Sequence, residues 1–329
     1  MLHPLKYFRN RKVGLALGSG GAKGLSHIAV IEYLDSLGIP VHMISGSSVG
    51  AVIGALHCAG ALGKFKRDII NFTLRDLLSF MDPVMPRSGF IEGKGFMKFM
   101  ARYIPRDANI EDFKKPLAIV ATDYIKGTPV IFRHGSVLEA LRASVSIPGI
   151  LVPVRSRETL LVDGGVANPL PLNVVKGMGA DLTIAVNLHP QLKKRGLKQY
   201  VESSLADQQA PAVSRAVAMA GKRRESAGAN SLAGIKWLKA IEQWIRTDSG
   251  SEKKNMPNIF EVMARSVDIM EYVNTALILN YNSPTVLIEP NVIDFQMLGF
   301  TDAEKIIDEG FLACERVKHI LIRKIRAWV

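Results

Sequence analysis

Short runs of apolar residues alternate along this chain with stretches of helical periodicity. Val13–Leu17 is an apolar run that ends at Gly18, and it predicts a buried strand. Residues 25–37 carry apolar side chains at helical spacing and stop at Gly38, a residue type that commonly follows a helix C-terminus. The same criteria predict further strands at 41–44, 116–122, 130–132, 160–162, 182–186 and 285–288, and further helices at 50–60, 259–280 and from about 302. Strands that alternate with helices predict an α/β protein with a mostly parallel central sheet.

One stretch, 192–257, breaks this alternation. It is rich in Lys, Ser, Gly and Ala. Within it, residues 231–246 place apolar and basic side chains on opposite sides of a helix. We therefore expect a single catalytic domain at 13–329, preceded by a basic arm at 1–12. The stretch 192–257 is then a basic, partly flexible insertion that carries an amphipathic helix.

Composition narrows the class of protein. Of the 329 residues, 48% are hydrophobic and 22% are charged, which excludes a wholly disordered chain. No apolar run approaches the length of about 18 residues that a transmembrane helix needs. Cys58 and Cys314 are the two cysteines, and they form neither a disulfide framework nor a zinc motif. The N-terminal residues lack the apolar core of a secretory signal, so we expect a cytoplasmic protein.

The net charge of +12 is concentrated in three segments. Residues 1–12 carry +4, residues 192–257 carry +7 and residues 311–329 carry +4, which leaves the remaining chain near neutrality. Basic segments on a near-neutral body suggest an anionic partner, either lipid or nucleic acid. Solvated charged faces without a partner are the alternative.

The segment 231–246 contains the candidate membrane contacts. An amphipathic helix with tryptophans on its apolar side and lysines on its polar side is suited to a membrane interface. A helix packed on the protein's own core, or across a dimer, is the alternative. The candidate contacts are Trp237, Ile241 and Trp244, together with Lys236 and Lys239.

The sequence GSSVG spans Gly46 to Gly50, after a predicted strand and at the start of a predicted helix. This is the setting of a nucleophile elbow, in which a sharp turn exposes a serine. Ser48 is therefore the candidate nucleophile. The N–H of Val49 and the N-terminus of the helix would face an oxyanion formed there.

A second glycine-rich turn follows the first strand. It matches neither the phosphate-binding GxxxxGK[ST] loop nor the dinucleotide-binding GxGxxG pattern. A loop whose backbone N–H groups stabilise an oxyanion is one remaining use, and a tight strand-to-helix turn is the other. The turn comprises Gly18, Ser19, Gly20, Gly21, Ala22, Lys23 and Gly24.

A carboxylate, Asp163, ends a predicted strand and is followed by Gly164 and Gly165. It is placed to reach a neighbouring turn, although an aspartate in this setting also serves as a turn former.

Two histidines, His189 and His319, would complete the chain order of a Ser–Asp–His triad. Their local sequences do not suggest catalysis, and too few predicted strands precede Ser48 for an α/β-hydrolase. We favour a two-residue Ser–Asp arrangement.

Taken together, these motifs resemble the patatin-like phospholipases, lipid acyl hydrolases with a Ser–Asp dyad. Six blocks occur in the order of the family: GSGGAKG, GSSVG, ATD at 121–123, RASVSIPGILVPV at 142–154, DGG, and GFTDAEKIIDEG at 299–310. Ser19 stands where the family loop usually has its first glycine, whereas Gly20, Gly21 and Lys23 retain the pattern.

The resemblance implies a three-layer α/β/α fold and an esterase mechanism. Ser48 would attack the ester carbonyl and Asp163 would accept its proton, while the N–H groups of Gly20, Gly21 and Val49 stabilise the oxyanion. It implies no cofactor and no metal, and a phospholipid or lysophospholipid substrate. The basic segments and the amphipathic helix add the expectation of peripheral binding at the inner face of an anionic membrane. A homo-oligomer is compatible with it, and no nucleic acid is expected.

Three other functions remain open at this point. A thioesterase or a transacylase would use the same dyad. A non-catalytic module that binds a lipid surface or nucleic acid would rest on the basic segments alone. A nucleotide-binding Rossmann enzyme is disfavoured by the glycine pattern.

Overall fold

The computed structural model describes residues 11–79, 82, 91–156, 158–189 and 259–326. All of them belong to one compact unit made of Met1–Pro190 and Asp248–Val329. Most of the predicted basic arm and the whole predicted insertion, including its amphipathic helix, lie outside the described residues.

The centre of this unit is an eight-stranded sheet in the order β5-β6-β3-β2-β1-β7-β8, with β4 paired to β3. From β3 to β8 along this order, neighbouring strands are parallel, while β4, β5 and β6 pair in antiparallel fashion. The predicted mostly parallel sheet is confirmed. The strands are β1 Val13–Leu17, β2 Met43–Ser47, β3 Leu117–Asp123, β4 Pro129–Phe132, β5 Val154–Ser156, β6 Thr159–Asp163, β7 Leu182–Val186 and β8 Val286–Ile288.

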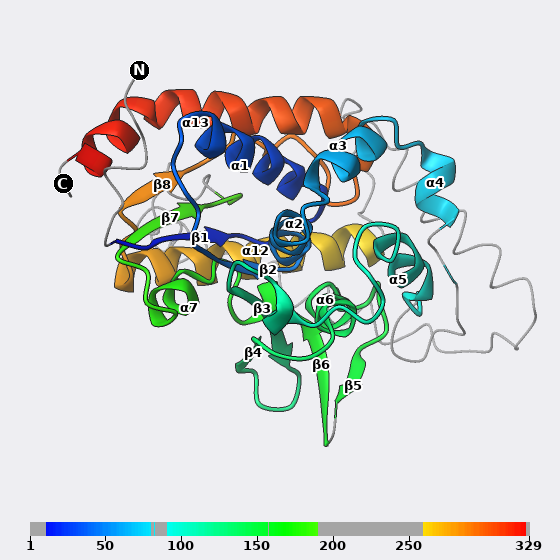
Figure 1. Cartoon of the computed structure of the whole chain (residues 1–329). Helices are drawn as coiled ribbons and strands as arrows, with labels where there is room; N and C mark the ends of the chain where they lie inside the picture. The colour runs from blue at the N-terminus through cyan, green and yellow to red at the C-terminus, as the bar shows by residue number, and fades with distance from the viewer. Residues whose placement is uncertain (1–10, 80–81, 83–90, 157, 190–258, 327–329) are drawn as a thin grey trace, which may run out of the picture. The chain divides into compact units, whose positions relative to one another are not determined.

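Helices cover both faces of the sheet, which confirms the three-layer architecture (Figure 1). α1, α2 and α13 pack on one face, and α7 and α12 pack on the other. The α-helices are α1 Ser26–Ser36, α2 Val49–Cys58, α3 Leu62–Ile70, α4 Leu74–Ser79, α5 Lys94–Met100, α6 Val137–Ser144, α7 Leu172–Gly177, α12 Ile259–Tyr281 and α13 Ala303–Arg326. Short 3₁₀ turns are η2 Gly21–Leu25, η3 Ile110–Asp112, η4 Gly164–Val166 and η6 Phe300–Asp302.

The second strand differs from its prediction. It was expected at 41–44, and the structure places it at Met43–Ser47. Parallel pairing on both sides extends it, because Gly46 pairs with Leu17 of β1 and Ser47 pairs with Val120 of β3. The strand therefore runs to the residue immediately before Ser48.

Several short elements carry no clear signal in the sequence. The helices α3 to α7 are at most nine residues long, which is too few turns for an apolar stripe to stand out from chance. The three-residue strand β5 is shorter still. Three of these helices, α3, α4 and α5, contribute to the cavity described below.

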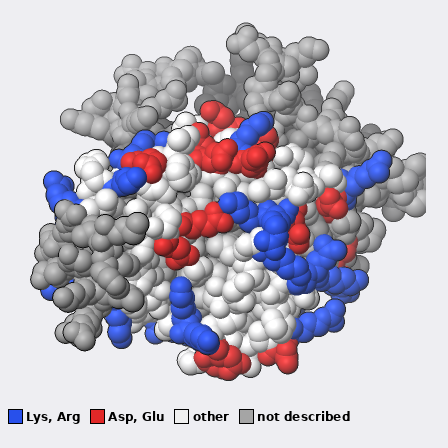
Figure 2. Space-filling model, turned by 45° about the horizontal axis from the view of Figure 1, so that its top comes forward, with Lys and Arg blue, Asp and Glu red and all other residues white. Residues whose placement is uncertain are grey.

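The surface of the described part carries both charge signs. On the face shown in Figure 2, basic and acidic side chains are interspersed around broad uncharged areas. Within the described ranges, no helix is both long enough and apolar enough to cross a bilayer.

Candidate active site

Ser48 occupies a strained turn between β2 and α2. Its φ of 52° and ψ of −124° place it in a backbone region that non-glycine residues rarely adopt. No other non-glycine residue in the described ranges has a positive φ. A Cβ on Gly50 would lie 2.2 Å from the carbonyl oxygen of Leu17, so the start of α2 approaches β1 as closely as it does only because residue 50 is glycine.

The Ser48 hydroxyl donates a hydrogen bond to Oδ2 of Asp163 at 2.6 Å. The two side chains lie 115 residues apart in the chain, and both are buried. Strand β3 brings them together, because Val120 pairs with Ser47 while the next residue, Ala121, pairs with Asp163. The ends of β2 and β6 therefore meet at one point of the sheet.

Two further side chains hold Ser48 and Asp163 in this arrangement: Ser144, at the end of α6, and Thr122, near the end of β3. The Ser48 N–H donates to Oγ of Ser144 at 2.9 Å, and that hydroxyl donates to the Val120 carbonyl at 2.6 Å. Oγ1 of Thr122 donates to the Asp163 carbonyl at 2.8 Å. Sequence reasoning assigned neither Ser144 nor Thr122 a role, although both lie in blocks that resemble the family.

Burial raises the pKa of Asp163 to about 8, and the negative charge of Glu271 contributes in the same direction. Hydrogen bonds from Ser48 and from the N–H of Gly165 oppose the rise. A carboxylate with such a pKa is a far stronger base than a free aspartate. The pair has the arrangement of a nucleophile and an adjacent base.

Within the described ranges, two N–H groups of the glycine-rich loop have no acceptor. The N–H groups of Gly18, Ser19 and Ala22 donate to the carbonyls of Val186, Pro169 and Met297. Between them, Gly20 and Gly21 have φ angles of 148° and 58°, and their N–H groups find no acceptor among the described residues. Gly20 is buried and Gly21 is half-buried. Buried backbone donors are rarely left unpaired, so a loop built in this way is suited to an anionic ligand.

A buried histidine supports the first residue of that loop. Nε2 of His27 lies 2.8 Å from the Gly18 carbonyl oxygen, so this nitrogen carries the proton and donates it. Burial lowers the pKa of His27 to about 4, which keeps the imidazole neutral.

An apolar cavity of about 180 Å³ adjoins Ser48. Gly21 and Val49 share its lining with Ser48, and helices α3 and α5 supply aromatic side chains. The remaining lining is hydrocarbon, so the cavity fits an acyl chain and offers no partner to a charged group. The aromatic residues are Phe65, Phe72, Phe96, Phe99 and Phe300.

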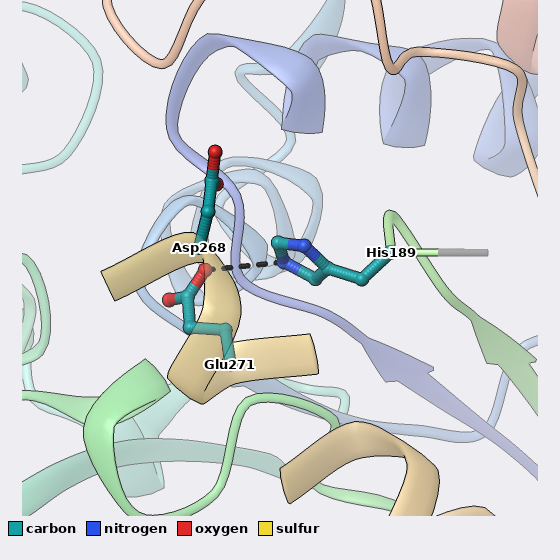
Figure 3. Close-up of side chains that lie close together, drawn as sticks. All are labelled: His189, Asp268 and Glu271. Atoms are coloured by element: carbon teal, nitrogen blue, oxygen red, sulfur yellow. Dashed lines mark ion pairs between the residues drawn. The ribbon is translucent and has the colours of Figure 1, made fainter. Parts of the chain in front are cut away.

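Behind the glycine-rich loop lies a cluster of charged side chains (Figure 3). Nε2 of His189 lies 3.1 Å from Oε2 of Glu271, and Nζ of Lys23 lies 3.3 Å from Oδ1 of Asp268. The ligand atoms of the histidine and the two carboxylates lie within 4.8 Å of one another, as in a cation site. Each carboxylate already faces a basic side chain, so we interpret the cluster as two ion pairs.

The histidines considered for a triad lie elsewhere. The described contacts of the Asp163 carboxylate are with Ser48 and Gly165, whereas His189 faces Glu271 and the Ser19 carbonyl. His319 lies exposed on α13. The structure therefore places no described histidine between Ser48 and Asp163.

The family model for patatin-like phospholipase matches residues 15–176 of this chain. These residues form a patatin-like phospholipase domain. Every candidate catalytic and oxyanion residue lies inside the matched range, whereas His189, Asp268 and Glu271 lie beyond it. The family motifs therefore gave no signal for the charged cluster.

Curated relatives extend the similarity. An uncharacterized NTE family protein of Mycobacterium tuberculosis is 41% identical over 178 residues, which are 54% of this chain and 49% of that protein. Lysophospholipase nte1 of Aspergillus fumigatus is 34% identical over 184 residues, 54% of this chain and 12% of that protein. Human patatin-like phospholipase domain-containing protein 6 is 26% identical over 305 residues, 91% of this chain and 20% of that protein. The chain thus spans about half or less of the length of these relatives.

The remaining glycines predicted from the motifs of this patatin-like domain are structural neighbours of Ser48 and Asp163. Gly46 is the last residue but one of β2 and lies beside the first turn of α2, and Gly24 packs against the Val49 side chain. Gly164 and Gly165 form the η4 turn after Asp163. The candidate membrane contacts Lys236, Trp237, Lys239, Ile241 and Trp244 lie outside the described residues.

Proposed function

We propose that this chain is a serine-dependent lipid acyl hydrolase that cleaves carboxylic esters of phospholipids or lysophospholipids. The observation that carries the proposal is the 2.6 Å hydrogen bond from Ser48 to the buried Asp163 carboxylate, at the wall of an apolar cavity. The patatin-like phospholipase family and the relative named as a lysophospholipase support the substrate class.

In the first step, Ser48 Oγ attacks the ester carbonyl carbon and its proton passes to Oδ2 of Asp163. The N–H groups of Gly20, Gly21 and Val49 donate to the oxyanion of the tetrahedral intermediate. Collapse of the intermediate breaks the ester C–O bond, and the proton on Asp163 goes to the departing alcohol. The fatty acyl group stays on Ser48 as an ester.

In the second step, a water molecule attacks the acyl-serine. Asp163 accepts a proton from the water, and the same backbone donors stabilise the second oxyanion. Collapse releases the fatty acid, and the Asp163 proton returns to Ser48 Oγ. Each carboxylate protonation is reversed within the cycle, so the residues end as they began.

The cavity accounts for a preference for acyl groups. Its aromatic and aliphatic lining removes hydrocarbon from water, which favours binding by about 0.8 kcal/mol for each buried CH₂ group. A charged head group has no counterpart there. We therefore place the acyl chain in the cavity and the polar part of the lipid outside it.

A labelling experiment tests the proposal. The wild-type chain, Ser48→Ala and Asp163→Asn are treated with a fluorophosphonate probe, and the turnover of a p-nitrophenyl ester and of a lysophospholipid is measured alongside. Ser266→Ala, on an exposed face of α12, is the matched serine control. We expect labelling and turnover in the wild type and in the control, and neither with Ser48→Ala. A wild-type chain that neither labels nor hydrolyses either ester, with or without liposomes, would overturn the proposal.

A further inference from the structure

Nε2 of His189 donates to one oxygen and lies beside a second. Its acceptor is the carbonyl oxygen of Ser19 at 3.2 Å, and Oε2 of Glu271 lies 3.1 Å from the same nitrogen as an ion-pair contact without a hydrogen bond (Figure 3). A carbonyl oxygen only accepts hydrogen bonds, so Nε2 is the ring nitrogen that carries the proton. The imidazole and the carboxylate are both nearly inaccessible to solvent, with exposed side-chain fractions of 7% and 4%.

The carbonyl that His189 contacts belongs to the peptide group between Ser19 and Gly20. The N–H of that same peptide, that of Gly20, is one of the two loop donors that have no acceptor among the described residues. A hydrogen bond to the carbonyl oxygen of a peptide polarises its N–H and strengthens the bond that the N–H can make. It also fixes the plane of the peptide, which glycine at position 20 would otherwise allow to rotate.

The neighbouring carbonyl of the loop is held in the same way. Gly18 accepts from Nε2 of His27, and Ser19 accepts from Nε2 of His189. Both carbonyls are thus engaged by a ring nitrogen. Their engagement fixes two consecutive peptide planes of the loop.

Glu271 contacts both His189 and the turn that follows Asp163. A Cβ on Gly165 would lie 1.9 Å from Oε1 of Glu271, so the carboxylate packs directly against the residue whose N–H binds Asp163. One turn earlier on α12, Asp268 pairs with Lys23 of the loop. One turn later, Nδ2 of Asn274 donates to the Val166 carbonyl at 2.8 Å. Helix α12 therefore contacts both the oxyanion loop and the Asp163 turn.

We propose that His189 and Glu271 are a positioning pair for the proposed ester hydrolysis: the His189 N–H fixes and polarises the Ser19–Gly20 peptide, and Glu271 holds the imidazole in place. The inference rests on the proposed function. Among the described contacts, neither residue touches Ser48, so both act through the backbone of the loop rather than on the substrate.

The closing experiment compares His189→Phe, His189→Gln and Glu271→Gln with the wild type. Phenylalanine keeps a ring but removes the donor, and glutamine keeps a donor. Thr275→Val, a buried position one turn beyond Glu271 on α12, is the matched control. For each folded variant we measure kcat and KM for a soluble ester. We also measure the affinity for a trifluoromethyl ketone, which forms an oxyanion with the serine, and for the matching alcohol, which does not.

We expect His189→Phe to lower kcat about tenfold with KM nearly unchanged, a smaller loss than the 10²–10³-fold effect of removing a whole donor. Ketone affinity falls by a similar factor while alcohol affinity is kept. His189→Gln recovers part of the loss, Glu271→Gln shows an intermediate loss, and Thr275→Val matches the wild type.

Unchanged kcat and ketone affinity in His189→Phe would overturn the pair, as would an equal loss for the ketone and the alcohol, which indicates disturbed packing. If His189→Phe does not fold, the glutamine variants decide by the same comparison. A wild-type chain without serine reactivity would instead count against the proposed function itself, so the two failures are distinguishable.

Discussion

The backbone N–H of Gly165 donates to Oδ1 of Asp163 at 2.7 Å, the carboxylate oxygen that Ser48 does not use. One oxygen of the proposed base is thus held by its own turn, and the other faces the proposed nucleophile. The carboxylate needs no third side chain to orient it. This relationship explains how a two-residue arrangement achieves the alignment for which a triad employs a histidine and a second carboxylate.

Asp163→Asn keeps this geometry and removes the base. The asparagine oxygen can accept from the Gly165 N–H while its amide group donates to Ser48, so the fold is preserved. The variant has no carboxylate to accept the proton of the Ser48 hydroxyl. We expect kcat to fall by about 10³–10⁴-fold, comparable with loss of a triad carboxylate. Steady-state kinetics and a melting curve check both parts. Wild-type turnover in the asparagine variant would show that Asp163 is not the base.

The pH dependence of hydrolysis follows from the raised pKa of Asp163. The base must be unprotonated, so with a pKa of about 8 we expect the rate to rise with pH through that value. Glu271→Gln removes the negative charge that contributes to the raised pKa. The rising limb of the profile should therefore shift to lower pH in this variant, and a limb that stays in place would contradict the assignment.

Stability should depend on pH in the opposite sense. The pKa of about 8 keeps a proton on Asp163 in the folded state up to a pH near 8, while the unfolded chain releases it near the ordinary aspartate pKa of 3.8. Between these values the folded state binds more protons, so the free energy of unfolding falls as pH rises. Asp163→Asn should be more stable than the wild type by roughly 0.5–2 kcal/mol at pH 8, with little difference at pH 4. Denaturant titrations at both values measure this, and a gap that widens toward acid pH would refute it.

The positive φ of Ser48 stores backbone strain that a Cβ atom creates. Ser48→Gly relieves the strain and Ser48→Ala keeps it. We therefore expect the glycine variant to unfold with a free energy about 1 kcal/mol higher than the alanine variant. Equal stability, or a more stable alanine variant, would show that the turn relaxes without its hydroxyl.

The sequence segment 231–246 remains the predicted membrane contact. Deleting residues 225–255 should abolish binding to anionic liposomes and spare hydrolysis of a soluble short-chain ester. Co-sedimentation and esterase assays on the same preparation separate the two effects. Retained liposome binding would assign membrane contact to another part of the chain.

The local sequence pattern predicted several strands of this protein and its candidate catalytic residues. The bounds of β1 and β7 follow from apolar runs that end at polar or glycine residues, and the candidate nucleophile follows from a strand, a small-residue turn and a helix. These features depend on residues close together in the chain. The same holds for Asp163, whose motif places it at the end of a strand.

Tertiary structure decided which of these features meet. Ser48 and Asp163 come together only because β3 pairs with both β2 and β6, and β2 extends to Ser47 only because it has a strand on each side. Glu271 lies more than 100 residues beyond Asp163, on a helix without a family motif, and yet its charge contributes to the raised pKa of that base. Strand pairing, burial and charge proximity depend on distance in space, and a linear sequence does not contain those distances.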